Sequence, residues 1–533
     1  MNKAWILISI IFGQLQSIPY FADSFTKLLE HDPITGLLTD SGIKNYQQLT
    51  IALQTGKQED FNAINRASGT QRLWASPQSA FASMMDPQQF LMSIPPALSS
   101  ADAAVDLMSV YVMAACRDVA FSDFGTGQRT DKNKNGESLT KSSARILNKY
   151  SLAKVDAAHL FRGNALGAMI GPYLSQFLLQ SYLPLFPQDP TEVGAGNLPK
   201  RILSNPRHIP VFRQREFGVS WQDFVALQNG LIPRKFLASD CIQKRYPSTG
   251  RDLACYVYTD VAYDPYYYAL QVLVCNGFPY SKAFPHQQGI MKNESAGITM
   301  GLSDVYTLIA TVCQEAYKIC WYYKWRAFRR LRPEAMAGLL HRAILTGTNE
   351  FNVDASLFDT ELLALILEHN QKQSDKRIIG TAVLPRPESS TYLLAQVFPE
   401  GSPAHPSYPA AHAVIAGACV TIIKAFFDDT ALILSKMKPV LVDPANPTKL
   451  QYYKGLDALK MTVGSELNKL ATNIAYARSW AGIHFISDNE AGLQLGEEIA
   501  IAVLKKHAQQ YHEQGFKGFE FTKRDGTRII VNK

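Results

Sequence analysis

Apolar residues recur at every third or fourth position through eight segments of this 533-residue chain. This spacing puts them on one face of an α-helix, so each segment is predicted to be a helix that buries one side. The segments are 100–116, 142–149, 302–331, 335–346, 356–369, 412–427, 451–478 and 488–511. Because 47% of the residues are hydrophobic, there is enough apolar material for a large core. We predict a mainly α protein whose core is one large helical bundle.

Signals for β-structure are few. Residues 253–261 alternate weakly between apolar and polar side chains, and residues 519–532 predict a small C-terminal hairpin that turns at Asp525-Gly526. Pro and Gly are frequent in 183–212, which predicts a long surface connection. We therefore predict an N-terminal helical region over 23–150 that shares one core with a catalytic region over 151–533.

The N-terminus has the pattern of a secretory leader. Lys3 precedes a short apolar run, which predicts a signal peptide over 1–22 and a periplasmic or secreted mature chain. A buried first helix is the alternative. The seven cysteines form no CxxC pair, which argues against a redox or zinc-ribbon motif. Cys241 and Cys255 could form a disulfide in an oxidising compartment.

The charge of the chain is mildly positive, at +7, and does not predict binding to nucleic acid. An uninterrupted apolar run of about 18 residues is absent, so we expect no membrane span in the mature chain. Asp131, Asn133 and Asn135 have the oxygen spacing of a calcium loop, but Ser142 replaces the bidentate Glu of such loops. A polar turn is the alternative there.

Segment 321–338 gathers basic side chains among aromatic ones. Lys324 and Arg332 are eight residues apart, so in one continuous helix they would lie roughly 80° apart around the axis. Pro333 must end or bend that helix. The long side chains at this end could converge on one anion. A solvated basic face is the alternative.

Segment 400–427 begins with three prolines that favour an extended approach, followed by a helix of small residues that starts near Ala410. His412 then lies in the first helical turn. The N–H groups of a first turn have no partner within the helix, so they can bind an anion. An ordinary loop that leads into a core helix, with His412 as a polar cap, explains the pattern equally well.

Segment 474–496 holds a further cation and a histidine–carboxylate pair. Arg478 and His484 would lie on different faces of one helix, but Gly482 allows a break that turns both inward. Asp488 is one helical turn after His484, so its carboxylate can accept the Nδ1 proton and leave Nε2 free. A surface His–Asp pair is the alternative.

Together the three segments read Lys-x7-Arg-Pro, Pro-Ser-Tyr-Pro-x-x-His and Arg-x5-His-x3-Asp. This combination resembles the signature of the vanadium-dependent haloperoxidases, which share their fold and site with the type 2 phosphatidic acid phosphatases. The contexts KWRAFRRLRPEA and SPAHPSYP are most similar to bromoperoxidases. The resemblance covers about 155–505. It implies a helical-bundle fold of the haloperoxidase/acid phosphatase type and a vanadate cofactor.

The resemblance also implies a role for each motif residue. His484 would be the metal ligand, and Asp488 would orient it. Vanadate oxygens would be bound by Lys324, Arg332, Arg478 and the backbone of Ala411. The catalytic residues would be His412, His405 and Lys324.

The activity that these roles imply is oxidation of a halide by hydrogen peroxide to hypohalous acid, through a peroxovanadate held by His484. His405 favours bromide or iodide, and the product would halogenate an organic nucleophile. Self-association is also typical of the family. Two other functions remain open at this point. One is an acid phosphatase with His484 as its nucleophile, and the other is an inactive oxyanion-binding or scaffold protein.

One departure from the family motif affects the expected affinity for vanadate. The family has Ser-Gly before the motif histidine, where this chain has Ala410-Ala411. A lost hydrogen bond to a charged group costs about 1.5–3 kcal/mol, or roughly ten- to a hundredfold in affinity. We therefore expect weaker vanadate binding than the family motif would provide.

Overall fold

The computed structural model describes residues 21–127, 132–152, 154–180, 215–233, 245–258, 260–374, 377–379, 382–384 and 391–533. Several predicted features lie partly or wholly outside these ranges. They are residues 1–20 of the leader, Asp131 of the calcium loop, Cys241 and the whole 183–212 connection. Asn133, which is described, accepts hydrogen bonds from the backbone N–H groups of Asn135 and Glu137, both at 3.0 Å.

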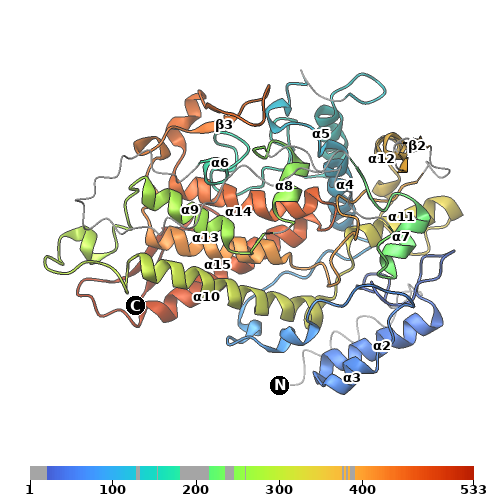
Figure 1. Ribbon diagram of the computed structural model, residues 1–533, viewed down its shortest axis with the longest axis horizontal. Coiled ribbons are helices and arrows are strands. Elements are labelled where there is room, and N and C mark those ends of the chain that lie inside the picture. The colour runs from blue at the N-terminus through green and yellow to red at the C-terminus, as the bar shows by residue number, and fades with distance from the viewer. Residues whose placement is uncertain are drawn as a thin grey trace.

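Four long helices form the centre of the molecule: α10 (Leu302–Trp321), α13 (Ala411–Phe426), α14 (Val463–Trp480) and α15 (Ile486–Ala508). Helix α13 contacts the other three, and Figure 1 shows it between α10 and α14. Fifteen of the sixteen residues of α13 are buried, and His412 is the exception. Because α13 is apolar on every face, other helices must surround it.

Small residues bring α13 and α15 unusually close. A Cβ atom at Gly417 of α13 would lie 2.2 Å from the carbonyl oxygen of Leu493, and one at Gly496 of α15 would lie 2.0 Å from that of Val414. Real side chains do not tolerate such contacts, so both positions require glycine. The close packing fixes the first turn of α13, with His412, against the first turns of α15.

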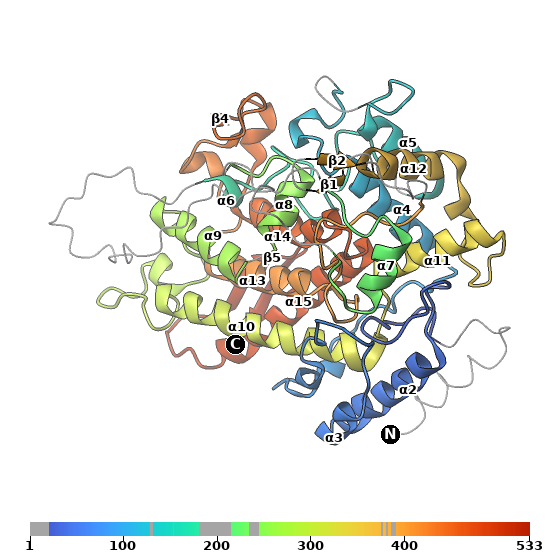
Figure 2. The same cartoon turned by 45° about the vertical axis from the view of Figure 1, so that its right-hand side comes forward.

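The remaining helices surround this centre. Helix α4 (Ala101–Cys116) packs against α5 (Leu139–Tyr150), α11 (Pro333–Thr346) and α12 (Thr360–Ser374), and Figure 2 shows this group on one side of the molecule. One buried apolar cluster extends from Met85 to Val531. A smaller cluster joins the N-terminal segment to Trp325. The other helices are α2 (Asp40–Thr55), α3 (Gln58–Asn62), α6 (Gln176–Leu179), α7 (Trp221–Gln228), α8 (Gly250–Tyr256) and α9 (Asp264–Cys275).

In the described ranges the strands form three two-stranded antiparallel sheets. The C-terminal hairpin pairs β5 (Gly518–Thr522) with β6 (Arg528–Asn532), and Phe519 lies opposite Val531. This hairpin and the mainly α fold confirm the predictions from the sequence. The other pairs are β1 (Arg377–Ile379) with β2 (Ala382–Leu384), and β3 (Val440–Val442) with β4 (Leu450–Tyr452).

Two predictions of secondary structure are wrong. The weak alternation in 253–261 does not form a strand, because Gly250–Tyr256 is helix α8, capped by Thr249 and buried on all sides. A fully buried short helix lacks the polar face that reveals helical periodicity. The helix predicted from residue 451 begins only at Val463, because Thr462 and Ser465 form a capping box there.

Among the described residues, none of the helices is both long and apolar enough to cross a membrane.

Candidate active site

The first basic segment changes helix type at the site. Helix α10 ends at Trp321 and continues as a π-helix over Tyr322–Phe328, which ends where Arg329 has φ 48°. Lys324 lies in the π-helix, and Arg332 is the N-cap of α11. The prediction that both lie on one helix, roughly 80° apart, is therefore wrong. The reversal of the chain between them brings both side chains into the interior.

Lys324 is completely buried. Its ammonium group donates to the carbonyl oxygens of Pro406 and Ser407, both at 2.8 Å. An ammonium has three protons, so one donor remains for another acceptor. Burial, together with the positive charge of Arg332, lowers the pKa of Lys324 to about 7. A bound anion would restore its charged form.

Arg332 connects the predicted site residues. Its Nε donates to the His405 carbonyl at 3.0 Å, and Nη1 donates to the Ile483 carbonyl at 2.7 Å. The guanidinium also lies 3.1 Å from Nε2 of His484 and 3.0 Å from Nδ1 of His405. Burial lowers the pKa of Arg332 to about 9.

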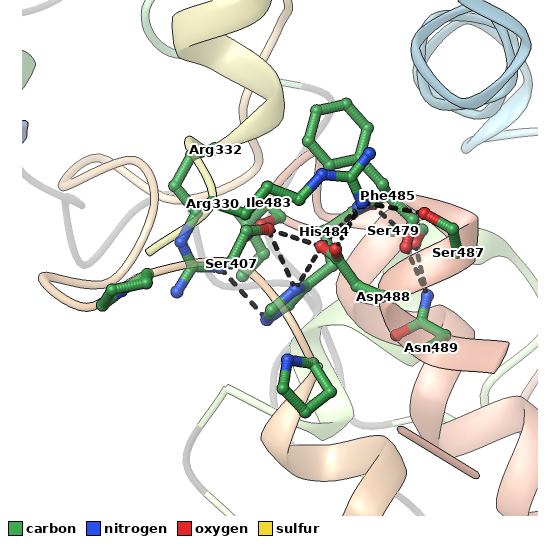
Figure 3. A network of polar contacts seen from close by, with 12 residues as sticks. Arg330, Arg332, Ser407, Ser479, Ile483, His484, Phe485, Ser487, Asp488 and Asn489 are labelled. Carbon is green, nitrogen blue, oxygen red and sulfur yellow. Dashed lines mark hydrogen bonds and ion pairs between the residues drawn. The ribbon is translucent and has the colours of Figure 1, made fainter. Parts of the chain in front are cut away.

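The tautomer of His484 follows from these contacts (Figure 3). Arg332 can only donate, so Nε2 of His484 accepts, and the proton of the neutral ring must be on Nδ1. Nδ1 lies 2.9 Å from Oδ2 of Asp488. Burial and the charge of Arg332 hold the pKa of His484 well below its usual value. His484 is therefore a neutral imidazole with its Nε2 lone pair directed toward Arg332.

Asp488 is fully buried and accepts more hydrogen bonds than the sequence suggests. Besides His484, it accepts from the backbone N–H of Phe485 at 3.0 Å, from the hydroxyl of Ser407, and from Arg330 at 2.8 Å. Burial alone would raise the pKa of Asp488, but Arg330 and the bond to His484 lower it below its usual range. Asp488 is thus an ionised carboxylate that holds one imidazole proton in place.

Arg330 and Ser407 are site residues that the sequence analysis missed. Arg330 donates to Ser487 at 2.8 Å and to Asp106 at 3.2 Å, and its guanidinium lies 4.1 Å from the centre of the Phe485 ring. Figure 3 shows Arg330 and Ser407 on different sides of the Asp488 carboxylate. The only sequence signal was their position within the RRLRP and PSYP runs, which does not identify a partner.

Arg478 and His484 lie on either side of a break in the helix, as predicted. Helix α14 ends at Trp480, Gly482 has φ 82°, and α15 begins at Ile486. Arg478 donates to the Val257 carbonyl at 3.3 Å, while its Nε is buried and has no partner among the described residues. Burial lowers the pKa of Arg478, and the charge of Asp260 opposes that shift.

His412 and His405 have different surroundings. His412 lies 3.1 Å from the carboxylate of Asp260, which the sequence analysis did not identify. His405 is buried, and its ring lies 4.9 Å from the ring of Trp321. Burial, together with Lys324 and Arg332, holds the pKa of His405 well below its usual value. His405 is therefore a neutral base, whereas His412 has a carboxylate beside it.

Three buried cations of the site lack a direct ion pair in the part of the chain that the structure describes. Lys324, Arg332 and Arg478 are all at least nine-tenths buried, and none forms an ion pair with a carboxylate among the described residues. Burying an uncompensated cation is costly. Three of them around a neutral imidazole match the requirements of a tetrahedral oxyanion such as vanadate.

The N-terminus of α13 completes the candidate site. Ala410 is the N-cap and makes no side-chain hydrogen bond, and α13 begins at Ala411. A helix of this length has unpaired N–H groups and a partial positive charge at its first turn. Because Ala410 carries no hydroxyl, the side chain contributes nothing to the binding of an oxyanion there.

Comparison with known proteins identifies relatives along most of the chain. A family model described as the second helical-bundle domain of VCPO matches residues 380–514. The vanadium-dependent bromoperoxidase of Corallina pilulifera is 32% identical over 481 residues, which cover 84% of this chain and 77% of that protein. The vanadium-dependent bromoperoxidase of Ascophyllum nodosum is 31% identical over 469 residues, covering 84% and 75%.

The fold has a match among solved structures. The homohexameric second vanadate-dependent bromoperoxidase of Ascophyllum nodosum superposes with a TM-score of 0.77 at 24% identity, over 96% of this chain and 84% of that one. At this identity the likeness concerns the fold alone, whereas the sequence relatives exceed 30% identity over most of both chains. The chain therefore belongs to the vanadium-dependent haloperoxidase family.

Proposed function

We propose that this protein binds one vanadate between Lys324, Arg332, Arg478 and His484 and uses it to oxidise halide with hydrogen peroxide. The observation that carries the proposal is that three buried cations have no ion-pair partner among the described residues, and that one of them, Arg332, contacts the neutral imidazole of His484. When bound, vanadate supplies a Lewis acid that activates hydrogen peroxide. The side chains supply the charge balance, the single nitrogen ligand and the proton transfers.

Each residue has a distinct task in this proposal. His484 presents Nε2 because Asp488 holds the Nδ1 proton. Lys324 keeps one free donor for an oxygen of the oxidant, since the other two are directed to backbone carbonyls. His412 lies beside Asp260 in the first turn of α13, and His412 and the neutral His405 are the candidates for the proton transfers.

We also propose a halide, a self-associated form and a location for this protein. The similarity to vanadium-dependent bromoperoxidases, together with His405, supports bromide or iodide as the halide, and the proposed final acceptor is an organic nucleophile. The homohexameric relative supports self-association of this chain. The apolar run after Lys3 supports a periplasmic or secreted location.

A paired assay distinguishes peroxidase from phosphatase. The purified protein is incubated with orthovanadate and then given bromide, hydrogen peroxide and a phenolic dye, while parallel samples receive p-nitrophenyl phosphate without vanadate. We expect vanadate-dependent bromination of the dye. Phosphate release without any halogenation would instead support His484 as a phosphatase nucleophile.

Ala410→Ser is expected to tighten vanadate binding about tenfold, because the added hydroxyl can donate to a charged oxygen. Equilibrium dialysis against orthovanadate measures the change. Serine at an N-cap can also stabilise α13 by about 1 kcal/mol through a bond to a backbone N–H. A higher Tm without tighter vanadate binding would show that residue 410 caps the helix and does not face the oxyanion.

The lowered pKa of Lys324 predicts a pH dependence. With a pKa of about 7, Lys324 is mostly charged at pH 6 and mostly neutral at pH 8.5, and only the charged form attracts an oxyanion. The ratio of vanadate affinities, native over Lys324→Gln, should therefore fall about tenfold from pH 6 to pH 8.5. The ionisation of vanadate cancels in this ratio. A constant ratio would mean that Lys324 does not titrate in this range.

A further inference from the structure

The turn that joins α14 to α15 sets the geometry of the site. It comprises residues 481–485, carries His484 and begins three residues after Arg478. Both side chains are assigned to the same oxyanion, so the shape of the turn fixes the distance between them. Gly482 adopts φ 82° within it, in the left-handed region that favours glycine.

The first three carbonyls of this turn all accept hydrogen bonds from residues outside it. The pairs are Val397 N–H to Ala481 O at 3.2 Å, Gln396 Nε2 to Gly482 O at 2.7 Å, and Arg332 Nη1 to Ile483 O at 2.7 Å. A fourth bond, from the Ser479 hydroxyl to the His484 carbonyl at 2.8 Å, is local. Two of these three bonds come from Gln396 and Val397, so the segment around Gln396 makes most of the outside contacts with the turn.

Gln396 is the side chain in that segment whose polar contact is directed at the turn. It is 1% exposed, and its Nε2 makes the shortest of the contacts from this segment. Its Oε1 is buried and has no partner among the described residues. An amide that is half unsatisfied is costly to bury. The bond to Gly482 offsets part of that cost and gives a reason for a glutamine at this position.

The backbone that carries Gln396 is itself fixed. Gln396 exchanges two backbone hydrogen bonds with Phe217, each at 2.9 Å. Arg117, which is fully buried, donates to the neighbouring Ala395 carbonyl at 3.0 Å and to the Glu216 carboxylate at 2.8 Å. These contacts give the carboxamide a rigid support that does not depend on the turn.

The fit between Gln396 and the turn is tight. A Cβ atom at Gly482 would lie 2.7 Å from the Ala395 carbonyl and 2.9 Å from Nε2 of Gln396. The contact thus leaves room for glycine only, and the left-handed φ favours the same residue. The turn and the carboxamide form one packed unit immediately before His484.

We propose that Gln396 is a positioning residue that fixes the turn between Arg478 and His484 and so sets the spacing of two vanadate-binding groups. This inference rests on the proposed function, because the spacing matters only if both groups bind one oxyanion. Gln396 acts through the Gly482 carbonyl, and its carboxamide makes no hydrogen bond to the side chain of Arg478 or His484.

The test compares Gln396→Met with Gln176→Met. Methionine keeps the length of glutamine but cannot donate to Gly482. Gln176 is a matched control, since it is equally buried and lies outside the candidate site. Its side chain donates to the Val440 carbonyl and accepts from the Val440 N–H. For each purified protein, titration calorimetry gives the vanadate Kd. The Tm is measured separately, in the absence of vanadate. We expect both variants to lose similar thermal stability, but only Gln396→Met to bind vanadate about tenfold more weakly, or about 1.4 kcal/mol.

A second variant covers the case in which Gln396→Met does not fold. Gln396→Asn keeps an amide but withdraws the donor by one methylene, and the same loss of affinity is expected. Native-like vanadate affinity in a folded Gln396 variant would overturn the inference, as would an equal loss in Gln176→Met. Absence of vanadate binding by the unaltered protein would instead contradict the proposed function itself, and the positioning role with it.

Discussion

Replacing His484 by alanine is expected to abolish halogenation and to weaken vanadate binding by more than about a hundredfold. His484 is a neutral imidazole whose Nε2 faces the buried Arg332, with its tautomer fixed by Asp488 and Arg332. Changes to residues that hydrogen-bond a metal ligand cost about 10–100-fold in affinity, so loss of the ligand itself should cost more. Dialysis against orthovanadate measures the affinity, and dye bromination measures the activity.

His341→Ala is the matched control. His341 is also buried, and burial also lowers its pKa, to about 4, but it accepts from the backbone N–H of Tyr392 and contacts none of the candidate site residues. We expect this variant to lose stability and to keep the native vanadate affinity. If His484→Ala bound vanadate as well as His341→Ala does, His484 would not be the ligand.

Asp488→Asn is expected to have the second largest effect, on stability and on binding together. Asp488 is a buried partner of Arg330, and breaking a buried ion pair costs about 3–5 kcal/mol. Because Arg330 keeps Asp106, the lower end of that range is expected. The neutral amide also no longer holds the Nδ1 proton of His484 as a carboxylate does, so vanadate affinity should fall about 10–100-fold.

Glu466→Gln is the control that separates the effect of Asp488→Asn on stability from its effect on vanadate affinity. Glu466 is as buried as Asp488 and pairs with the buried Lys469 at 2.6 Å, in the first turn of α14. Its loss should lower Tm without changing the vanadate Kd. Equal loss of affinity in both variants would mean that Asp488 acts only through the stability of the fold.

The sequence predicted the fold class and most of the candidate site for a physical reason. Helical periodicity is local, so helices such as α10 and α15 are visible in the order of apolar residues. The break at Gly482 was also visible, because glycine permits the left-handed conformation that the chain adopts there. The contact between His484 and Asp488 follows from their spacing of one helical turn.

The remaining features depend on long-range contacts. The π-helix that carries Lys324 differs from an α-helix in no simple sequence property, so the relation of Lys324 to Arg332 was predicted wrongly. Ser407 and Asp488 are 81 residues apart in the chain, and His412 and Asp260 are 152 apart. Hydrogen bonds over such separations are determined by packing, which the order of residues does not reveal.

The central claim is that Lys324, Arg332, Arg478 and His484 hold one vanadate. The most direct test is the vanadium content of the full-length protein after incubation with orthovanadate and removal of free ligand on a desalting column, measured by mass spectrometry of the metal. We predict about one vanadium per chain in the native protein and almost none in His484→Ala. Little or no vanadium in the native protein, or an equal amount in both proteins, would contradict the claim.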